Sequence, residues 1–170
     1  MKKKEPVKYP FLPEGREILY VDLDNEFMAK AKDLCRESGC VKQPTGAVIV
    51  KYGKIIGTGT NAGRLVTECP RWDSPTGENY GPCKDVCHQT GHAEANAVKE
   101  MMKNYSESEY ENADIFLYGH WWCCQNCWKA MEEGKIKNVY LLKNSENLFN
   151  PEKNIEMKKW GKPTEKTIEK

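Results

Sequence analysis

The stretch GAVIVKYGKIIGT, residues 46–58, decides the fold of this chain. Two β-prone runs, Gly46 to Val50 and Lys54 to Thr58, are separated by Tyr52-Gly53, a spacing that predicts an antiparallel hairpin. Strands that alternate with helices usually pair in parallel, so a hairpin added to such strands makes the predicted sheet mixed.

The segment before the hairpin has the periodicity of a helix, from Asp24 to Ser38. Asp24 or Asn25 can accept hydrogen bonds from the first free N–H groups, and Gly39 can adopt the left-handed conformation that ends a helix. Five residues form the apolar face: Phe27, Met28, Ala31, Leu34 and Cys35.

Helices and strands alternate in the second half of the chain. We predict helices over His92 to Lys103 and Cys124 to Glu133, and strands over Asp114 to Tyr118 and Asn138 to Leu142. The whole order predicts an α/β domain whose helices cover a central mixed sheet. We expect one domain over residues 1–170, with its core at about 24–149 and charged extensions at both ends.

Composition and charge exclude several classes of protein. The 170 residues include 39% hydrophobic and 30% charged residues with a net charge of +1, which argues against a protein that wraps nucleic acid. No apolar run approaches the roughly 18 residues that a membrane span needs. We therefore expect a soluble, cytoplasmic protein with neither a membrane nor a nucleic acid as its partner.

A long irregular insertion extends from Leu65 to Thr90, broken by several prolines and glycines. In a reducing compartment, the eight cysteines of this chain favour metal binding or catalysis over disulfides. A structural zinc ion could cross-link the insertion through four ligands: Cys69, Cys83, Cys87 and His88. Cys40 competes for one of these positions, and isolated free thiols are the alternative.

Two short motifs carry the chemistry, Gly91-His92-Ala93-Glu94 and Cys124-Gln125-Asn126-Cys127. Two cysteines three positions apart at a helix start lie on one face, where the helix dipole favours thiolates. With one histidine they provide three ligands, so the fourth tetrahedral position of a zinc ion is left for water, as catalytic sites require. Glu94 is close enough to His92 to exchange protons with that water.

Two other interpretations fit parts of this pattern. The zinc site could be purely structural, with Glu94 a solvated helix residue. Cys124 and Cys127 could instead form a redox dithiol, which would leave His92 and Glu94 unexplained.

The order and spacing of these motifs resemble the cytidine and deoxycytidylate deaminase family, most closely its deoxycytidylate branch, from about Asn25 to Leu142. Further similar stretches are Ser38-Gly39-Cys40, Gly46-Ala47-Val48-Ile49-Val50, Thr58-Gly59-Thr60-Asn61, His92-Ala93-Glu94-Ala95-Asn96-Ala97 and Gly134-Lys135-Ile136-Lys137-Asn138-Val139-Tyr140. The resemblance implies a cytidine-deaminase-like three-layer α/β/α sandwich.

The resemblance also implies an activity, a zinc-dependent hydrolytic deaminase that converts a cytosine nucleotide or nucleoside of the dCMP type to the uracil product and releases ammonia. It makes His92, Cys124 and Cys127 the ligands of one catalytic Zn²⁺ and Glu94 the general acid/base. Some members of the deoxycytidylate branch carry a second, structural zinc in the region of the insertion. The resemblance further suggests a homo-oligomer.

The second motif departs from the family, because His120-Trp121-Trp122-Cys123 stands where a small polar stretch and a proline are usual. Trp122 is the better tryptophan candidate for substrate contact, with packing beside the sheet as the alternative. Cys123 and Cys127 are also one helical turn apart, but Cys124 preserves the two-residue gap and is the ligand that we predict.

Asn61 resembles the family asparagine that binds the sugar, and its alternative is the role of a turn residue. Lys42 and Arg64 could approach a phosphate, but neither is assigned to one. Two other functions stay open: deamination of another base or of a base within a nucleic acid, and zinc-stabilised binding without turnover. Release of ammonia and salt-dependent binding of oligonucleotides would distinguish them.

Overall fold

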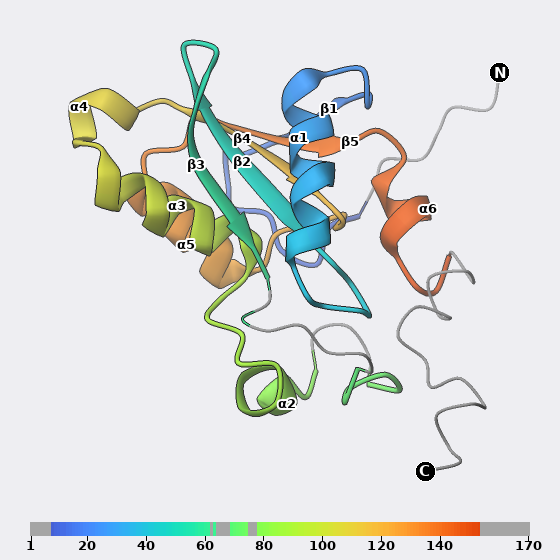
Figure 1. The fold of residues 1–170 in the computed structure, drawn as a ribbon. Coiled ribbons are helices and arrows are strands. Elements are labelled where there is room, and N and C mark those ends of the chain that lie inside the picture. Colours follow the sequence, from blue (N-terminus) through green and yellow to red (C-terminus); the bar gives the residue numbers. More distant parts are fainter. Residues whose placement is uncertain (1–7, 62, 64–68, 75–77, 154–170) are drawn as a thin grey trace, which may run out of the picture.

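In the described part of the chain, five strands form one sheet in the order β1-β5-β4-β2-β3 (Figure 1). The computed structural model describes residues 8–61, 63, 69–74 and 78–153. The strands are β1 (Ile18–Val21), β2 (Gly46–Lys51), β3 (Lys54–Thr60), β4 (Asp114–Tyr118) and β5 (Asn138–Leu142). β1, β5 and β4 pair in parallel, whereas β2 runs antiparallel to both β3 and β4. The predicted mixed sheet is confirmed.

The hairpin of β2 and β3 closes where the sequence predicted it. Lys51 pairs with Lys54, and the two residues between them have positive φ, 51° at Tyr52 and 73° at Gly53. Two successive positive φ angles are the requirement of the tight turns that match the twist of a hairpin.

Helices cover both faces of the sheet. α1 (Glu26–Leu34) lies on one face, whereas α3 (Ala93–Asn104) and α5 (Gln125–Glu133) lie on the other (Figure 1). β2 is buried on both sides, because Val48 and Val50 pack in the core with α1 while Ala47 and Ile49 pack in the core with α3 and α5. This arrangement confirms the predicted three-layer α/β/α sandwich.

The predicted helix over Asp24 to Ser38 is shorter than expected but correctly placed. Asn25 is its N-cap, with Oδ1 accepting hydrogen bonds from the backbone N–H groups of Phe27 and Met28. The last turn continues as a 3-10 helix, η1 (Cys35–Glu37), and Gly39 has a φ of 70°.

Four short elements were not predicted: β1, α2 (Gly81–Asp85), α4 (Glu107–Tyr110) and α6 (Ser145–Phe149). Each has only four or five residues, too few to give a clear periodicity. In its described residues, the insertion expected to be irregular contains one short helix, α2. Among the described helices, none has both the length and the apolar composition that crossing a membrane requires.

Close packing of β3 against α3 positions the start of that helix. A Cβ atom at Gly59 would lie 2.3 Å from the carbonyl oxygen of Ala93 and 2.4 Å from the backbone nitrogen of Ala97. Glycine is thus required for this approach, which brings the first turn of α3 against the sheet.

Candidate active site

The starts of two helices hold the three potential metal ligands. His92 is the N-cap of α3, Cys124 is the N-cap of α5, and Cys127 lies in the first turn of α5. The backbone N–H of Cys127 donates to Cys124 Sγ at 3.4 Å. The free N–H groups and the positive end of the helix dipole favour a thiolate at this position.

The three ligand atoms are close together. His92 Nδ1 lies 3.4 Å from Cys124 Sγ and 3.3 Å from Cys127 Sγ, and the two sulfur atoms are 3.3 Å apart. Around zinc, with bonds of about 2.0 Å to nitrogen and 2.3 Å to sulfur, tetrahedral ligand atoms lie roughly 3.5 to 3.8 Å apart. These atoms fit zinc after moving apart by a few tenths of an ångström. Within the described residues, no other His, Cys, Asp or Glu side chains form such a group of three.

The two cysteines share a proton. The hydrogen bond from the Cys127 thiol lowers the pKa of Cys124 to about 4, and His92 contributes to the same effect. The same hydrogen bond and burial raise the pKa of Cys127. A hydrogen bond with Cys124 also raises the pKa of His92. One thiolate is therefore present before a metal binds.

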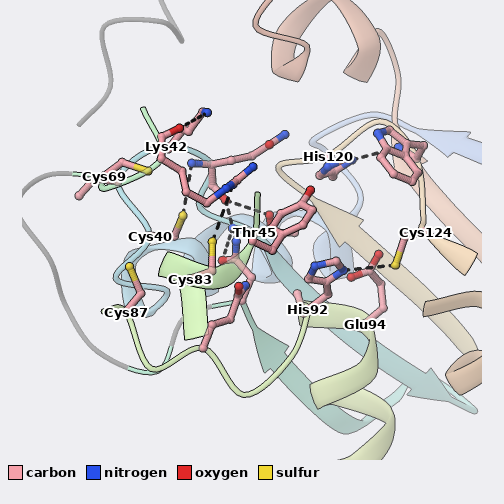
Figure 2. A pocket seen from close by; sticks show the side chains of 18 residues that line it. Cys40, Lys42, Thr45, Cys69, Cys83, Cys87, His92, Glu94, His120 and Cys124 are labelled. Carbon is pink, nitrogen blue, oxygen red and sulfur yellow. Dashed lines mark hydrogen bonds between the residues drawn. The ribbon is translucent and has the colours of Figure 1, made fainter. Parts of the chain in front are cut away.

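Glu94 supplies a carboxyl group beside the trio. It lies in the first turn of α3 with 4% of its surface exposed, and it lines the same cavity as His92 and Cys124 (Figure 2). Burial raises the pKa of Glu94, and the charge of His92 opposes that shift. A carboxyl group with a raised pKa can both accept and donate a proton near neutral pH.

Cys123 is not part of the metal-ligand group. Its side chain is fully buried, and its thiol hydrogen-bonds to the carboxyl group of Glu94. The geometry thus favours the predicted ligand assignment, with Cys124 and not Cys123 beside His92.

A second set of cysteines lines the other part of the cavity. Cys40, Cys69, Cys83 and Cys87 all face this space (Figure 2). His88, predicted as a ligand, is exposed and does not line the cavity, and its φ of 53° marks a turn after Cys87. Cys40, which the sequence named as a competitor for one position, does line the cavity.

Positive side chains accompany this second set. Arg71 Nη1 lies 3.7 Å from Cys83 Sγ, and the backbone N–H of Gln43 donates to Cys40 Sγ at 3.5 Å. Lys42 Nζ donates to the carbonyl oxygens of Arg71 at 2.7 Å and Ser74 at 2.6 Å, which fixes it beside the same loop. N–H donors and cations of this kind stabilise thiolates.

Asn61 lines the cavity, but most of its amide group is used within the protein. Oδ1 accepts from Ser38 Oγ at 2.5 Å and from the backbone N–H of Thr45 at 3.1 Å, while Nδ2 donates to the carbonyl oxygen of Gln43 at 2.8 Å. The side chain therefore supports the loop that carries Cys40. Among the described residues, the Asn61 amide nitrogen has this one hydrogen bond, so a contact with a substrate stays a prediction.

Trp122 also lines the cavity, and so does His120 from the same atypical loop, whose histidine and tryptophans could alter base recognition. Trp122 is half-buried, and its Nε1 has no hydrogen-bond partner among the described residues. His120 follows the end of β4 by two residues, in the loop that departs from the family pattern. Arg64, considered for a phosphate, lies outside the described residues.

Comparisons with known proteins agree with this architecture. Residues 21–143 match the family model described as the cytidine and deoxycytidylate deaminase zinc-binding region. A dCMP deaminase from the cyanophage S-TIM5, in apo form, has 23% identity and a TM-score of 0.50, over 75% of this chain and 89% of that chain. No curated protein matches the chain by sequence.

Two further structures are similar over most of the chain. The S-TIM5 dCMP deaminase in complex with dCMP and dUMP has 20% identity and a TM-score of 0.48, over 79% of this chain and 91% of that chain. A guanine deaminase from Bacillus subtilis has 23% identity and a TM-score of 0.46, over 73% of this chain and 68% of that chain.

Proposed function

Because the chain belongs to the cytidine and deoxycytidylate deaminase family of zinc-dependent enzymes, we propose that it deaminates a cytosine nucleotide or nucleoside, with dCMP as the first candidate. One observation carries the proposal: the buried Glu94 carboxyl group shares a cavity with His92 and Cys124. A structural zinc site has no need of such a group. Cytoplasmic location and assembly into a homo-oligomer stay predictions.

His92, Cys124 and Cys127 would hold the catalytic zinc. Two thiolates and one neutral imidazole balance the charge of Zn²⁺ and leave the fourth tetrahedral position open. A zinc ion held there would lower the pKa of water to about 7, so hydroxide would be available near neutral pH.

Glu94 would move the protons of the reaction. Its carboxylate accepts the proton that water loses as the water oxygen bonds to the amino-bearing carbon of the base. The same carboxyl group then gives this proton to the ring nitrogen beside that carbon, accepts the remaining proton of the added hydroxyl group and passes it to the amino group. The C–N bond breaks, ammonia leaves and the carbon keeps the oxygen as a carbonyl. Burial of Glu94, which raises its pKa, suits both proton transfers.

We also propose a second, structural zinc held by Cys40, Cys69, Cys83 and Cys87. The four side chains face one cavity, and Arg71 and Lys42 bring positive charge that a site of four thiolates needs. These sulfur atoms do not form a group at ligand distance in the described structure, so the ion itself would have to draw them together. The proposal therefore amounts to two zinc ions per chain.

The variant Glu94→Gln tests the catalytic proposal, because an amide keeps the shape of the side chain but cannot shuttle the proton. We expect unchanged zinc content and an activity about 10²- to 10⁴-fold lower. The measurements are ammonia release from a panel of cytosine, adenine and guanine compounds, and zinc by atomic absorption. Glu133→Gln, at an exposed position of α5, is the matched control and should leave both values unchanged. Full activity of Glu94→Gln would contradict the role of Glu94.

A further inference from the structure

The imidazole ring of His120 is held in one orientation by the two residues that follow it. Its Nδ1 accepts hydrogen bonds from the backbone N–H groups of Trp121 at 3.1 Å and Trp122 at 3.3 Å. The ring stacks on Trp121 with centroids 4.6 Å apart and meets Trp122 edge-on at 5.3 Å. A nitrogen that accepts two N–H groups carries no proton, so the neutral ring is protonated at Nε2.

The Nε2–H group is a donor without a partner in the described part of the chain. Every hydrogen bond of the ring among the described residues is made by Nδ1. His120 nevertheless lines the cavity that contains His92, Glu94 and Cys124, and Figure 2 shows these four side chains around the same end of it. A fixed donor that lines a cavity needs an acceptor, from water or from a ligand.

The surroundings of His120 suit a neutral acceptor on an aromatic ring. Burial, with the charge of His92, lowers the pKa of His120 to about 3, so its imidazole is neutral at physiological pH. A neutral donor binds a phosphate less strongly than Lys or Arg does. The adjacent Trp122 offers an aromatic surface on the same wall of the cavity. These features favour a base over a sugar phosphate.

We propose that His120 is a recognition residue for the base, and that its Nε2–H donates to a ring carbonyl oxygen. In cytosine, the amino-bearing carbon, a ring nitrogen and the carbonyl carbon follow one another in the ring. Guanine has the same succession of atoms between its amino group and its carbonyl group. Adenine has no carbonyl and would leave the donor unpaired, which costs binding energy. The proposal deepens the proposed function, on which it rests: it names amino-oxo bases as the substrate class and excludes adenine.

Two substitutions of His120 distinguish a role in recognition of the base from a role in holding the loop that contains it. The amide oxygen of His120→Asn can occupy the position of Nδ1 and keep the two backbone hydrogen bonds, but no donor reaches the position of Nε2. His120→Gln places an amide N–H near Nε2 and gives up the acceptor at Nδ1. We expect His120→Asn to raise KM for dCMP about 10- to 100-fold with little change in kcat, and His120→Gln to stay within about threefold of the wild type.

A second readout does not depend on turnover. Titration with dUMP, which keeps the ring carbonyl but has no amino group to lose, should quench tryptophan fluorescence because Trp122 lies in the cavity wall. His120→Asn should weaken this binding by the same factor as KM, at unchanged zinc content and unchanged Tm. Equal dUMP affinity in His120→Asn and the wild type would overturn the proposal, and so would equal losses in both variants, which would indicate a role in the loop alone.

The substrate panel distinguishes failure of the proposed role of His120 from failure of the proposed cytosine deaminase activity. A wild-type enzyme that deaminates a guanine compound and no cytosine compound would refute the cytosine proposal, while a raised KM of His120→Asn for that compound would support the role of His120. Activity on adenine compounds alone would refute both. Absence of turnover together with absence of dUMP binding would also overturn the role of His120.

Discussion

Two groups of cysteines face the same cavity, and they are held in different ways. Cys124 and Cys127 lie at the start of α5, where the sulfur atoms are 3.3 Å apart and both are within 3.4 Å of His92 Nδ1. Cys40, Cys69, Cys83 and Cys87 come from loops and from the short helix α2, and they form no group at ligand distance. Helix starts on a packed sheet preorganise ligands, whereas loops need the metal to do so.

The charges around the two groups differ as well. Glu94 is the charged neighbour of the first group, and it can take part in proton transfer. Lys42 and Arg71 accompany the second group, and burial lowers the pKa of Lys42 while the nearby thiols, Cys69 first, oppose that shift. A carboxyl group can exchange protons with water at a catalytic site. Cations stabilise the thiolates of a site that has no catalytic role.

The largest effect is expected at the preorganised group. Cys124→Ser should remove one zinc ion per chain and lower activity at least about 10³-fold, because the hydroxyl is a poor zinc ligand and His92 and Cys127 alone would then remain of the described ligand group. Zinc analysis and ammonia release measure both effects. Cys123→Ser is the matched control, since its side chain contacts Glu94 instead of the trio, and it should keep the zinc. The reverse pattern of zinc loss would show that Cys123 is the ligand.

A smaller effect is expected at the second group, in stability more than in catalysis. Cys40→Ser should reduce zinc from two ions to one per chain and lower Tm by about 4 to 8 °C, if the site contributes about 2 kcal/mol. Cys35→Ser serves as control, because the Cys35 thiol contacts backbone oxygens of Ala31 and Pro44 and lies in another part of the fold. One zinc ion per fully loaded wild-type chain would contradict the second site.

Much of the fold could be predicted from the sequence, because the long elements bury one face or both faces in a regular pattern. The hairpin at residues 46–58 and the helices at Glu26–Leu34, Ala93–Asn104 and Gln125–Glu133 all lie within a few residues of their predicted bounds. β1 was missed, because its four residues are defined by pairing with β5, more than 100 positions away in the chain. Pairing over such a distance leaves no local pattern.

The residues of the candidate site also differ in how well the sequence predicts them. His92, Glu94, Cys124 and Cys127 could be predicted because each pair lies in a local motif at the start of one helix. Cys40 could be named only as a competitor, since it is brought to the insertion by the tertiary fold. His120 stands in a loop that the sequence marks as atypical, but the orientation of its ring could not be predicted, because it depends on hydrogen bonds from the two residues that follow it.

The smallest predicted effect concerns the metal-free protein, in which Cys124 should be alkylated by iodoacetamide faster than Cys40 at pH 6. The pKa of Cys124 is lowered to about 4 by its hydrogen bond from Cys127, whereas burial raises the pKa of Cys40. At pH 6, Cys124 then has about 300-fold more thiolate than an ordinary cysteine with a pKa of about 8.5. The nucleophilicity of a thiolate falls with its pKa, by about 100-fold over this interval, so the net advantage of Cys124 over such an ordinary cysteine is only about threefold.

The pH profile makes this small difference measurable. The alkylation rate of Cys124 should be constant from pH 6 to 9 and should fall only as the pH drops toward 4, because its thiolate forms above that pKa. The rate of Cys40 should rise throughout the same range, because its thiol is still protonated. Peptide mapping by mass spectrometry follows both residues in one sample. A Cys124 rate that climbs with pH as that of Cys40 does would mean that the start of α5 does not preorganise a thiolate, and that both groups depend on the metal to assemble.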